Sequence, residues 1–208
     1  YEMGYEAGCT LADLEFVQFM PTTYAWPLSL AGKIVNDTIR GEGAVMRDGT
    51  GKRFMSAYDP VYGDMAGRDI LSIAIATEVA QGRGTPHGGV YLDARAVDPK
   101  KISESLGGTS KLLRMGIDPV RDMLEVTPSV HFTCGGIVTD EQCGAGVAGL
   151  FAVGDVSSGL HGANRRGANA MTETLVFGHI SGKSAAKHAA SILVFAPARN
   201  ERLDAYAK

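Results

Sequence analysis

Net charge, cysteine and long apolar runs are all scarce in this chain. Its 208 residues carry 20 lysines and arginines against 23 acidic residues, which gives a formal net charge of −3. That balance excludes the broad basic surface of a nucleic-acid-binding protein, so any basic site must be local. We therefore expect a small-molecule partner and no nucleic acid.

The three cysteines are Cys9, Cys134 and Cys143. They form no CxxC pair and lack the spacing of metal ligands, so we expect unpaired thiols in a reducing compartment and no metal or iron–sulfur cluster held by this chain. No apolar run approaches the roughly 20 residues of a membrane-spanning helix. We expect a cytoplasmic protein without direct membrane insertion, which partner subunits can bring to the inner face of a membrane.

Glycine, in contrast, is abundant, with 27 residues, well above the average usage of about 7%. The glycines are scattered among apolar segments, a pattern typical of tight turns and of close backbone approach to a cofactor. The chain begins without methionine in a segment of helical character. We therefore expect a fragment or a split subunit.

Apolar spacing predicts a mixture of helices and strands, and hence an α/β fold. Helices are expected over 2–9, 68–84, 99–114 and 167–193, and strands over 14–19, 89–95, 130–139 and 149–156. The last two strands are short, apolar and glycine-bounded, as in a buried α/β sheet. We also expect a turn at Pro21, a hairpin over 43–55 and a marginally ordered polar tail over 195–208.

Two neighbouring stretches of the sequence contain residues suited to contact a flavin cofactor. "GLFAVGD" (149–155) is an apolar strand that ends in Gly154 and Asp155, where a carboxylate can accept hydrogen bonds from the ribityl chain of a flavin. "GLHGANRRGANAM" (159–171) leads into a helix, whose N-terminus stabilises an anion such as the N1/C2 edge of a reduced flavin. A buried strand with a polar end is also common without any cofactor.

Seven motifs then occur in the order of a known family. They are "LEFVQFMPT", "RGEGA", "GRDILSIAI", "GGVYLD", "VHFTCGGI", "GLFAVGD" and "GLHGANRRGANAMTETLVFG". Over about residues 1–192 the chain resembles the fumarate reductase/succinate dehydrogenase flavoprotein family, which includes L-aspartate oxidase. The resemblance implies the C-terminal part of a Rossmann-like FAD-binding domain (1–20 and 126–194) interrupted by a capping domain with an α+β fold (21–125). It also places the family's Gly-rich dinucleotide lobe upstream of Tyr1.

The resemblance further implies FAD as cofactor, a small dicarboxylate as substrate and a role for each matched residue. Arg68 matches the proton donor, and Asp37 and Arg40 match its relay. Substrate-binding positions are Met20, Asn36, His131 and Arg165. Flavin-contacting positions are Gly154, Asp155, His161, Asn164, Ala168, Asn169, Ala170 and Met171. Arginine suits a carboxylate clamp because its planar fork binds both oxygens.

Several positions depart from the family pattern, and three of them bear on the substrate and the relay. Met20 stands where the family has histidine, and Asn36-Asp37 stand where it has Thr-Glu. Methionine cannot hold a carboxylate by a charged hydrogen bond. One end of a fumarate-like substrate is therefore expected to be bound differently.

Several alternatives stay open from sequence. The activity can be amino-acid oxidation of the L-aspartate oxidase type, or the chain can be a non-catalytic assembly module. Arg68 can simply pair with Asp64, and Asp37 with Arg40 as a structural ion pair. Partners can include an iron–sulfur electron-transfer subunit or a separate chain that carries the missing FAD lobe.

Overall fold

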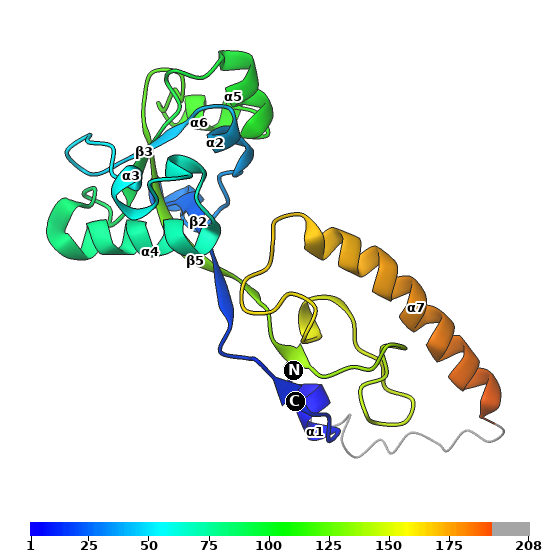
Figure 1. Cartoon of the computed structure of the whole chain (residues 1–208). Coiled ribbons are helices and arrows are strands. Elements are labelled where there is room, and N and C mark those ends of the chain that lie inside the picture. Colours follow the sequence, from blue (N-terminus) through cyan, green and yellow to red (C-terminus); the bar gives the residue numbers. More distant parts are fainter. Residues whose placement is uncertain (193–208) are drawn as a thin grey trace, which may run out of the picture. The chain divides into compact units, whose positions relative to one another are not determined.

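The computed structural model describes residues 1–192 and divides into two compact units (Figure 1). Unit 1 contains Tyr1–Phe16 and the chain from Thr133 onward, whereas unit 2 contains Val17–Phe132. The tail expected over 195–208 lies outside the described residues.

Unit 2 is built on a four-stranded sheet in the order β2-β5-β4-β3. The strands are β2 (Val17–Tyr24), β3 (Val45–Arg47), β4 (Val90–Asp93) and β5 (Leu124–Thr133). β4 runs antiparallel to both neighbours and aligns Leu92 with Met46 of β3 and with Leu124 of β5. These three side chains are at most 2% exposed, so the sheet contributes its centre to the core.

The turn expected at Pro21 is wrong, because β2 continues through Pro21 as far as Tyr24. Proline lacks an N–H and is tolerated in a strand only at a sheet edge or a bulge. β2 is the edge strand of this sheet, which permits it.

Helix α4 (Arg68–Glu78) packs against β2, as Figure 1 shows. Its buried residues Leu71, Ala74 and Ile75 recur at spacings of three and four, so they form one apolar stripe. A short π-helical segment, η3 (Val79–Arg83), extends α4 and ends where Gly82 takes a φ of +76°. The sequence predicted this helix and its glycine stop.

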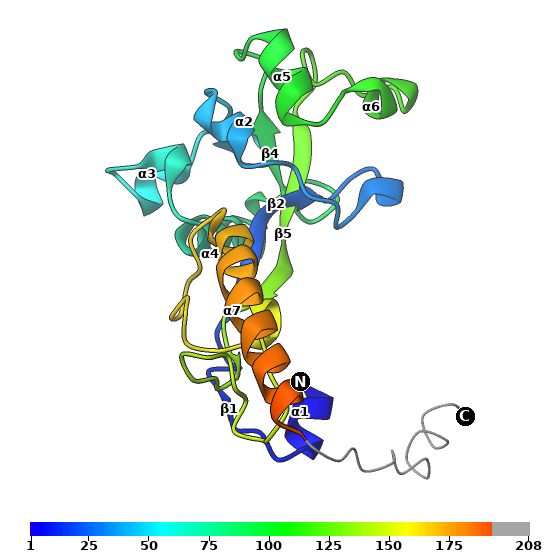
Figure 2. The same cartoon turned by 90° about the vertical axis from the view of Figure 1, so that its right-hand side faces the viewer.

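The single helix expected over 99–114 is wrong. The structure has α5 (Pro99–Ser105) and α6 (Ser110–Arg114). Gly107 and Gly108 separate them with φ values of +65° and +98°, which a right-handed helix cannot contain. In Figure 2, α5 lies next to α2 (Thr38–Gly41), which it contacts.

The hairpin expected over 43–55 forms only in part. The turn exists, since the Asp48 N–H donates to the Lys52 carbonyl and the Gly51 N–H donates to the Asp48 carbonyl. The second arm contributes only one bridge, from Arg53 to Arg47. Short helices complete unit 2: η1 (Leu28–Leu30), α3 (Met55–Tyr58) and η2 (Gly63–Met65).

Unit 1 has little regular sheet. It contains α1 (Glu2–Glu6), β1 (Leu11–Ala12), β6 (Gly136–Ile137) and η4 (Gly154–Val156). β1 and β6 pair antiparallel, and the cluster of buried residues is Cys9, Ile137, Ala145 and Ala152. All three cysteines are free and buried.

The strand expected over 149–156 is wrong for this structure. Phe151 makes only one bridge, to Gly144, and residues 154–156 form the 3₁₀ turn η4. A buried strand needs a neighbour on each side to pair its backbone groups. Residues 1–192 offer Phe151 only the bridge to Gly144.

The last described element is the long helix α7 (Asn169–Ser191). It forms as the small, apolar sequence predicts, but Glu173 is its only buried residue. Within residues 1–192, no helix has the length and apolar character needed to cross a membrane.

Candidate active site

One carboxylate in unit 2 binds two arginines. Asp37 Oδ2 accepts hydrogen bonds from Arg68 Nε at 3.0 Å and Nη2 at 2.9 Å. Asp37 Oδ1 accepts from Arg40 Nη2 at 3.0 Å. The structure thus brings together the proton donor and both relay residues suggested by the sequence, with Asp37 between the two guanidinium groups.

Local structure explains this geometry. Asp37 is the N-cap residue of α2, and Arg40 lies one turn later on the same short helix. Arg68 is the first residue of α4, directly after the N-cap Gly67. Two helix ends therefore present their charged side chains to each other.

Arg40 is the most buried of the three, at 7% exposure, against 18% for Arg68 and 27% for Asp37. A buried guanidinium is tolerated only when it is paired and hydrogen-bonded. Arg40 Nη1 accordingly donates to the Asp64 carbonyl at 2.7 Å and to the Ala66 carbonyl at 3.4 Å. Its Nε is buried and has no acceptor among residues 1–192.

The simple pairing of Arg68 with Asp64 is wrong. The Asp64 carboxylate instead accepts from Arg53 Nη2 at 2.6 Å and from the Met46 N–H at 2.7 Å. Asp37 and Arg40 do form an ion pair, but Asp37 also binds Arg68, so the pair is part of a larger network.

Sequence reasoning missed two neighbours of this network. Gln18 Oε1 lies 3.5 Å from Arg68 Nη1, and the Thr22 hydroxyl lies 3.4 Å from Asp37 Oδ1 while donating to the Val35 carbonyl at 2.9 Å. Gln18, Met20 and Thr22 alternate along β2 and are all buried. The two-residue period of a strand is the signal that could have found them.

The remaining substrate-binding candidates of unit 2 have different surroundings. Met20 is buried, at 2% exposure. Asn36 is exposed, and its side-chain oxygen accepts from the N–H and the hydroxyl of Thr38, which stabilises the start of α2. His131 lies near the end of β5 and is exposed.

Unit 1 holds the flavin-contacting candidates. Gly154 and Asp155 form η4, and Gly154 has a φ of +74°. Ala168 is the N-cap of α7 with a φ of +70° and provides no side-chain cap. Three candidates, Asn169, Ala170 and Met171, form the first turn of α7, while Asn164 and Arg165 lie in the loop before it, where Arg165 is buried and Asn164 exposed.

A buried carboxylate that the sequence analysis overlooked ties this loop to α7. Glu173 Oε2 lies 2.7 Å from His161 Nε2, and Ser157 Oγ lies 3.4 Å from Glu173 Oε1. The side chains of Glu173 and His161 are 3% and 6% exposed. Glu173 is the first acidic residue after Asp155, 18 positions later, and that isolation was the available signal.

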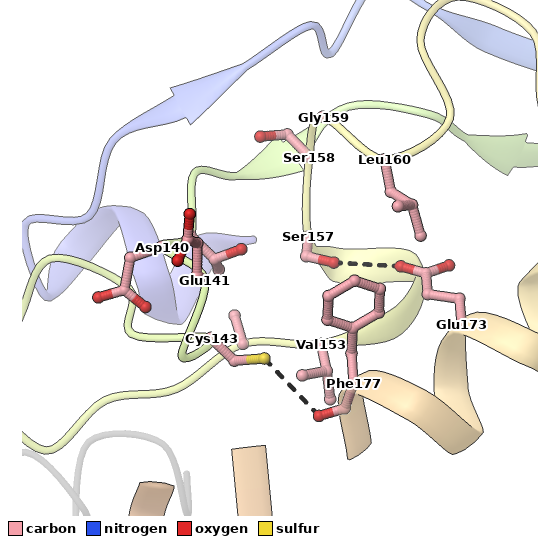
Figure 3. A pocket seen from close by; sticks show the side chains of 12 residues that line it. Asp140, Glu141, Cys143, Val153, Ser157, Ser158, Gly159, Leu160, Glu173 and Phe177 are labelled. Atoms are coloured by element: carbon pink, nitrogen blue, oxygen red, sulfur yellow. Dashed lines mark hydrogen bonds between the residues drawn. The ribbon is translucent and has the colours of Figure 1, made fainter. Parts of the chain in front are cut away.

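Two cavities adjoin Glu173. The first, of about 310 Å³, is lined by Asp140, Glu141, Cys143 and Phe177 among others, and Figure 3 shows the Glu173–Ser157 contact at its wall. Burial, and then the charge of Asp140, raise the pKa of the Cys143 thiol, so Cys143 is not an activated nucleophile. The second cavity, of about 290 Å³, is lined by His161, Asn169 and Val176 among others.

The start of α7 is chemically suited to an anion such as the N1/C2 edge of a reduced flavin. The 23-residue helix α7 presents a first turn whose N-cap offers no side-chain oxygen, so its partial positive charge remains available to an anion. The six residues 144–149 match the spacing GxGxxG, but they form a bridge, a bend and a turn, and no α-helix begins directly after them. A pyrophosphate cradle requires a strand, this loop and a helix in succession. Residues 144–149 therefore do not supply one.

Comparison with known proteins identifies the family of this chain and its cofactor. The profile of the FAD binding domain family matches residues 1–171. A fumarate reductase (CoM/CoB) subunit of Methanothermobacter marburgensis is 43% identical over 192 residues, covering 92% of this chain and 35% of that protein. An L-aspartate oxidase of Mycobacterium leprae is 42% identical over 189 residues, covering 89% of this chain and 35% of that protein. The chain thus spans about a third of the relatives' length.

Solved structures of flavoproteins are also similar to this chain over about a third of their length. The quinol fumarate reductase of E. coli superposes with a TM-score of 0.84 at 36% identity, covering 99% of this chain and 38% of that chain. The Sdh1 protein of Mycobacterium smegmatis superposes with a TM-score of 0.75 at 36% identity, covering 99% and 35%. The chain belongs to the FAD binding domain family, its relatives are flavoprotein oxidoreductases, and FAD is the family's cofactor.

Proposed function

We propose that this chain supplies the capping domain (21–125) and the flavin-contacting segments (1–20 and 126–194) of an FAD-dependent oxidoreductase. Its substrate would be a small dicarboxylate of the fumarate/succinate class. The observation that carries the proposal is Asp37, which accepts hydrogen bonds from both Arg68 and Arg40. A carboxylate placed between two guanidinium groups can pass a proton from one to the other.

FAD, when bound in its reduced form, would supply a hydride to one carbon of the C=C bond. Arg68 gives the proton that the other carbon takes, and Asp37 returns a proton to Arg68 from Arg40. His131 and Arg165 bind the substrate carboxylates and so favour the form in which negative charge develops at carbon. Arginine has a pKa above about 12, so it can act as an acid only toward a strongly basic carbanion.

The test uses the complete flavoprotein with fumarate as acceptor and a reduced viologen dye as donor. Arg68→Gln should lower kcat by about 10²- to 10⁴-fold, the usual contribution of a general acid. The flavin absorbance should stay unchanged, because neither Arg68 nor its hydrogen-bond partners Asp37 and Gln18 are among the proposed flavin-contacting residues.

Arg95→Gln is the matched control. Arg95 also pairs with a mostly buried carboxylate of unit 2, but that carboxylate is Asp93, which lies outside the relay. Its kcat should stay close to that of the wild type. Full activity of Arg68→Gln would remove Arg68 from the chemistry.

A second candidate activity is amino-acid oxidation, which the similarity to L-aspartate oxidases favours. Bleaching of the oxidised flavin by L-aspartate, but not by succinate, would support it. Bleaching by succinate with no response to L-aspartate would support the first candidate. A complete protein that takes up no flavin would instead favour the non-catalytic assembly role.

We further propose a cytoplasmic flavoprotein that passes electrons to or from an iron–sulfur partner subunit. The support is that one relative is itself named as one of the subunits of a fumarate reductase. Co-purification of the complete protein from its source, followed by iron analysis of the bound subunits, tests this.

A further inference from the structure

Arg40 donates hydrogen bonds to two different groups, and only one of them, Asp37, is part of the proposed relay. Its Nη2 donates to Asp37, while its Nη1 donates to the Asp64 carbonyl at 2.7 Å. Since a guanidinium is planar and rigid, fixing both Nη atoms fixes its orientation toward Asp37. The position of the Asp64 carbonyl therefore matters to the relay.

The side chain of Asp64 anchors that carbonyl. Oδ1 accepts from the Met46 N–H at 2.7 Å, and Oδ2 accepts from Arg53 Nη2 at 2.6 Å. Met46 lies on β3, which forms one edge of the sheet while β2 forms the other, so residues 1–192 provide no further strand to pair with its N–H. The Asp64 carboxylate thus connects η2 to strand β3 of the sheet.

The contacts of the Asp64 side chain also affect the segment that leads to Arg68. η2 (Gly63–Met65) contacts α2, and it is followed after Ala66 and Gly67 by Arg68. The Ala66 carbonyl also accepts from Arg40 Nη1, at 3.4 Å. Asp64 therefore lies in the segment that connects the two arginines.

We propose that Asp64 is a positioning residue of the proton relay: its carboxylate, bound to the Met46 N–H, fixes the η2 turn whose carbonyl orients Arg40 toward Asp37. Asp64 touches no reacting atom in this role. The relevance to catalysis rests on the proposed function, whereas the effect on Arg40 does not.

Three variants of the complete flavoprotein separate the contributions. Asp64→Asn keeps an oxygen that accepts from the Met46 N–H and loses only the ion pair with Arg53, which is 60% exposed and so weakly stabilising. Asp64→Ala loses both contacts. Asp48→Ala is the control, because Asp48 is a buried carboxylate of the same unit that accepts from the N–H groups of Thr50 and Lys52.

Asp64→Ala should lower kcat for fumarate by about 10- to 100-fold, the cost of a misplaced catalytic group. KM should stay within about twofold, because substrate binding is unaffected. The pH profile of kcat should change, since proton return becomes limiting. Asp64→Asn should retain most of kcat, and Asp48→Ala should lose stability but keep the wild-type pH profile.

Crystal structures of the variants give a readout that does not depend on activity. In Asp64→Ala, Arg40 should lose its 3.0 Å contact with Asp37, and in Asp64→Asn it should keep it. An unmoved Arg40 in Asp64→Ala overturns the inference, as does an Asp64→Asn variant that is as slow as Asp64→Ala. If Asp64→Ala does not fold, Asp64→Ser carries the same expectation, because its shorter hydroxyl does not reach the Met46 N–H.

Failure of the proposed function looks different. A wild-type protein without fumarate reductase activity, or a fully active Arg68→Gln variant, would contradict the catalytic role of the relay that Asp64 supports. The position of Arg40 in the Asp64→Ala crystal would still decide the structural inference.

Discussion

At the residue scale, unit 2 contains two carboxylates that each bind two arginines, and they differ in exposure. Asp93 is 8% exposed and accepts from Arg47 Nε at 2.7 Å and Arg95 Nε at 2.8 Å. Asp37 is 27% exposed. We therefore expect the more buried Asp93 network to serve stability, whereas the more open Asp37 network is the proposed proton relay.

The hydrogen bonds from Arg95, and then from Arg47, hold the pKa of the Asp93 carboxyl well below its usual value, against the opposing effect of burial. A lowered carboxyl pKa stabilises the fold above the unfolded pKa of about 3.9, and the effect is lost as pH falls toward the folded value. Asp93→Asn should therefore lower the unfolding free energy at pH 7 by about 2 kcal/mol. The difference from wild type should shrink between about pH 5 and pH 3, as urea midpoints will show.

The exposed pair Arg121–Asp118, with an N–O distance of 3.7 Å, gives the matched control. Arg121→Gln should change stability by less than about 0.5 kcal/mol at any of these pH values. An Asp93→Asn deficit that stays constant with pH would show that the loss comes from packing and not from the charge.

At the element scale, the central strand β4 depends on the glycine that precedes it. A Cβ at Gly89 would lie 2.3 Å from the carbonyl oxygen of Val126 on β5, so a side chain would push the paired strands apart. Gly89→Ala should destabilise the chain by about 1–3 kcal/mol, as overpacking of a core does. Thermal unfolding of the 208-residue chain measures the loss.

Gly41, the last residue of α2, is the control for this substitution. Nothing lies within 4 Å of a Cβ built there, and its φ is not positive. Gly41→Ala should be neutral, or stabilising by up to about 1 kcal/mol, because alanine favours a helix. Equal losses in both variants would argue against the close contact as the cause.

The elements also show where sequence reasoning works. Helices α4 and α7 were predictable, because each has its own periodic or small-residue pattern and a glycine near its boundary. The expected strand over 149–156 failed because strand formation depends on partners that residues 1–192 supply only in part. Asp64 was unpredictable as a support of Arg40, since the contact joins residues 24 apart through a backbone carbonyl.

At the scale of the whole molecule, the chain combines two units that differ in how much hydrophobic core they bury. Unit 2 has a sheet and a large buried core of its own, whereas α7 of unit 1 buries only Glu173. Met171, Leu175 and Val176 of α7 are between 48% and 69% exposed. The relatives are about three times as long as this chain, so we expect the remaining two thirds to contribute to FAD binding.

That expectation can be tested by comparing FAD with riboflavin. Residues 1–192 include the N-terminus of α7, the proposed flavin contact, but residues 144–149, which match GxGxxG, do not open a helix. Since residues 144–149 form no pyrophosphate cradle, the 208-residue chain should quench the fluorescence of both compounds weakly and with similar affinity. The complete protein should bind FAD far more than tenfold more tightly than riboflavin, a difference in binding free energy well above about 1.4 kcal/mol. A chain that alone prefers FAD to riboflavin by that margin would place the phosphate-binding groups within these 208 residues, against our expectation.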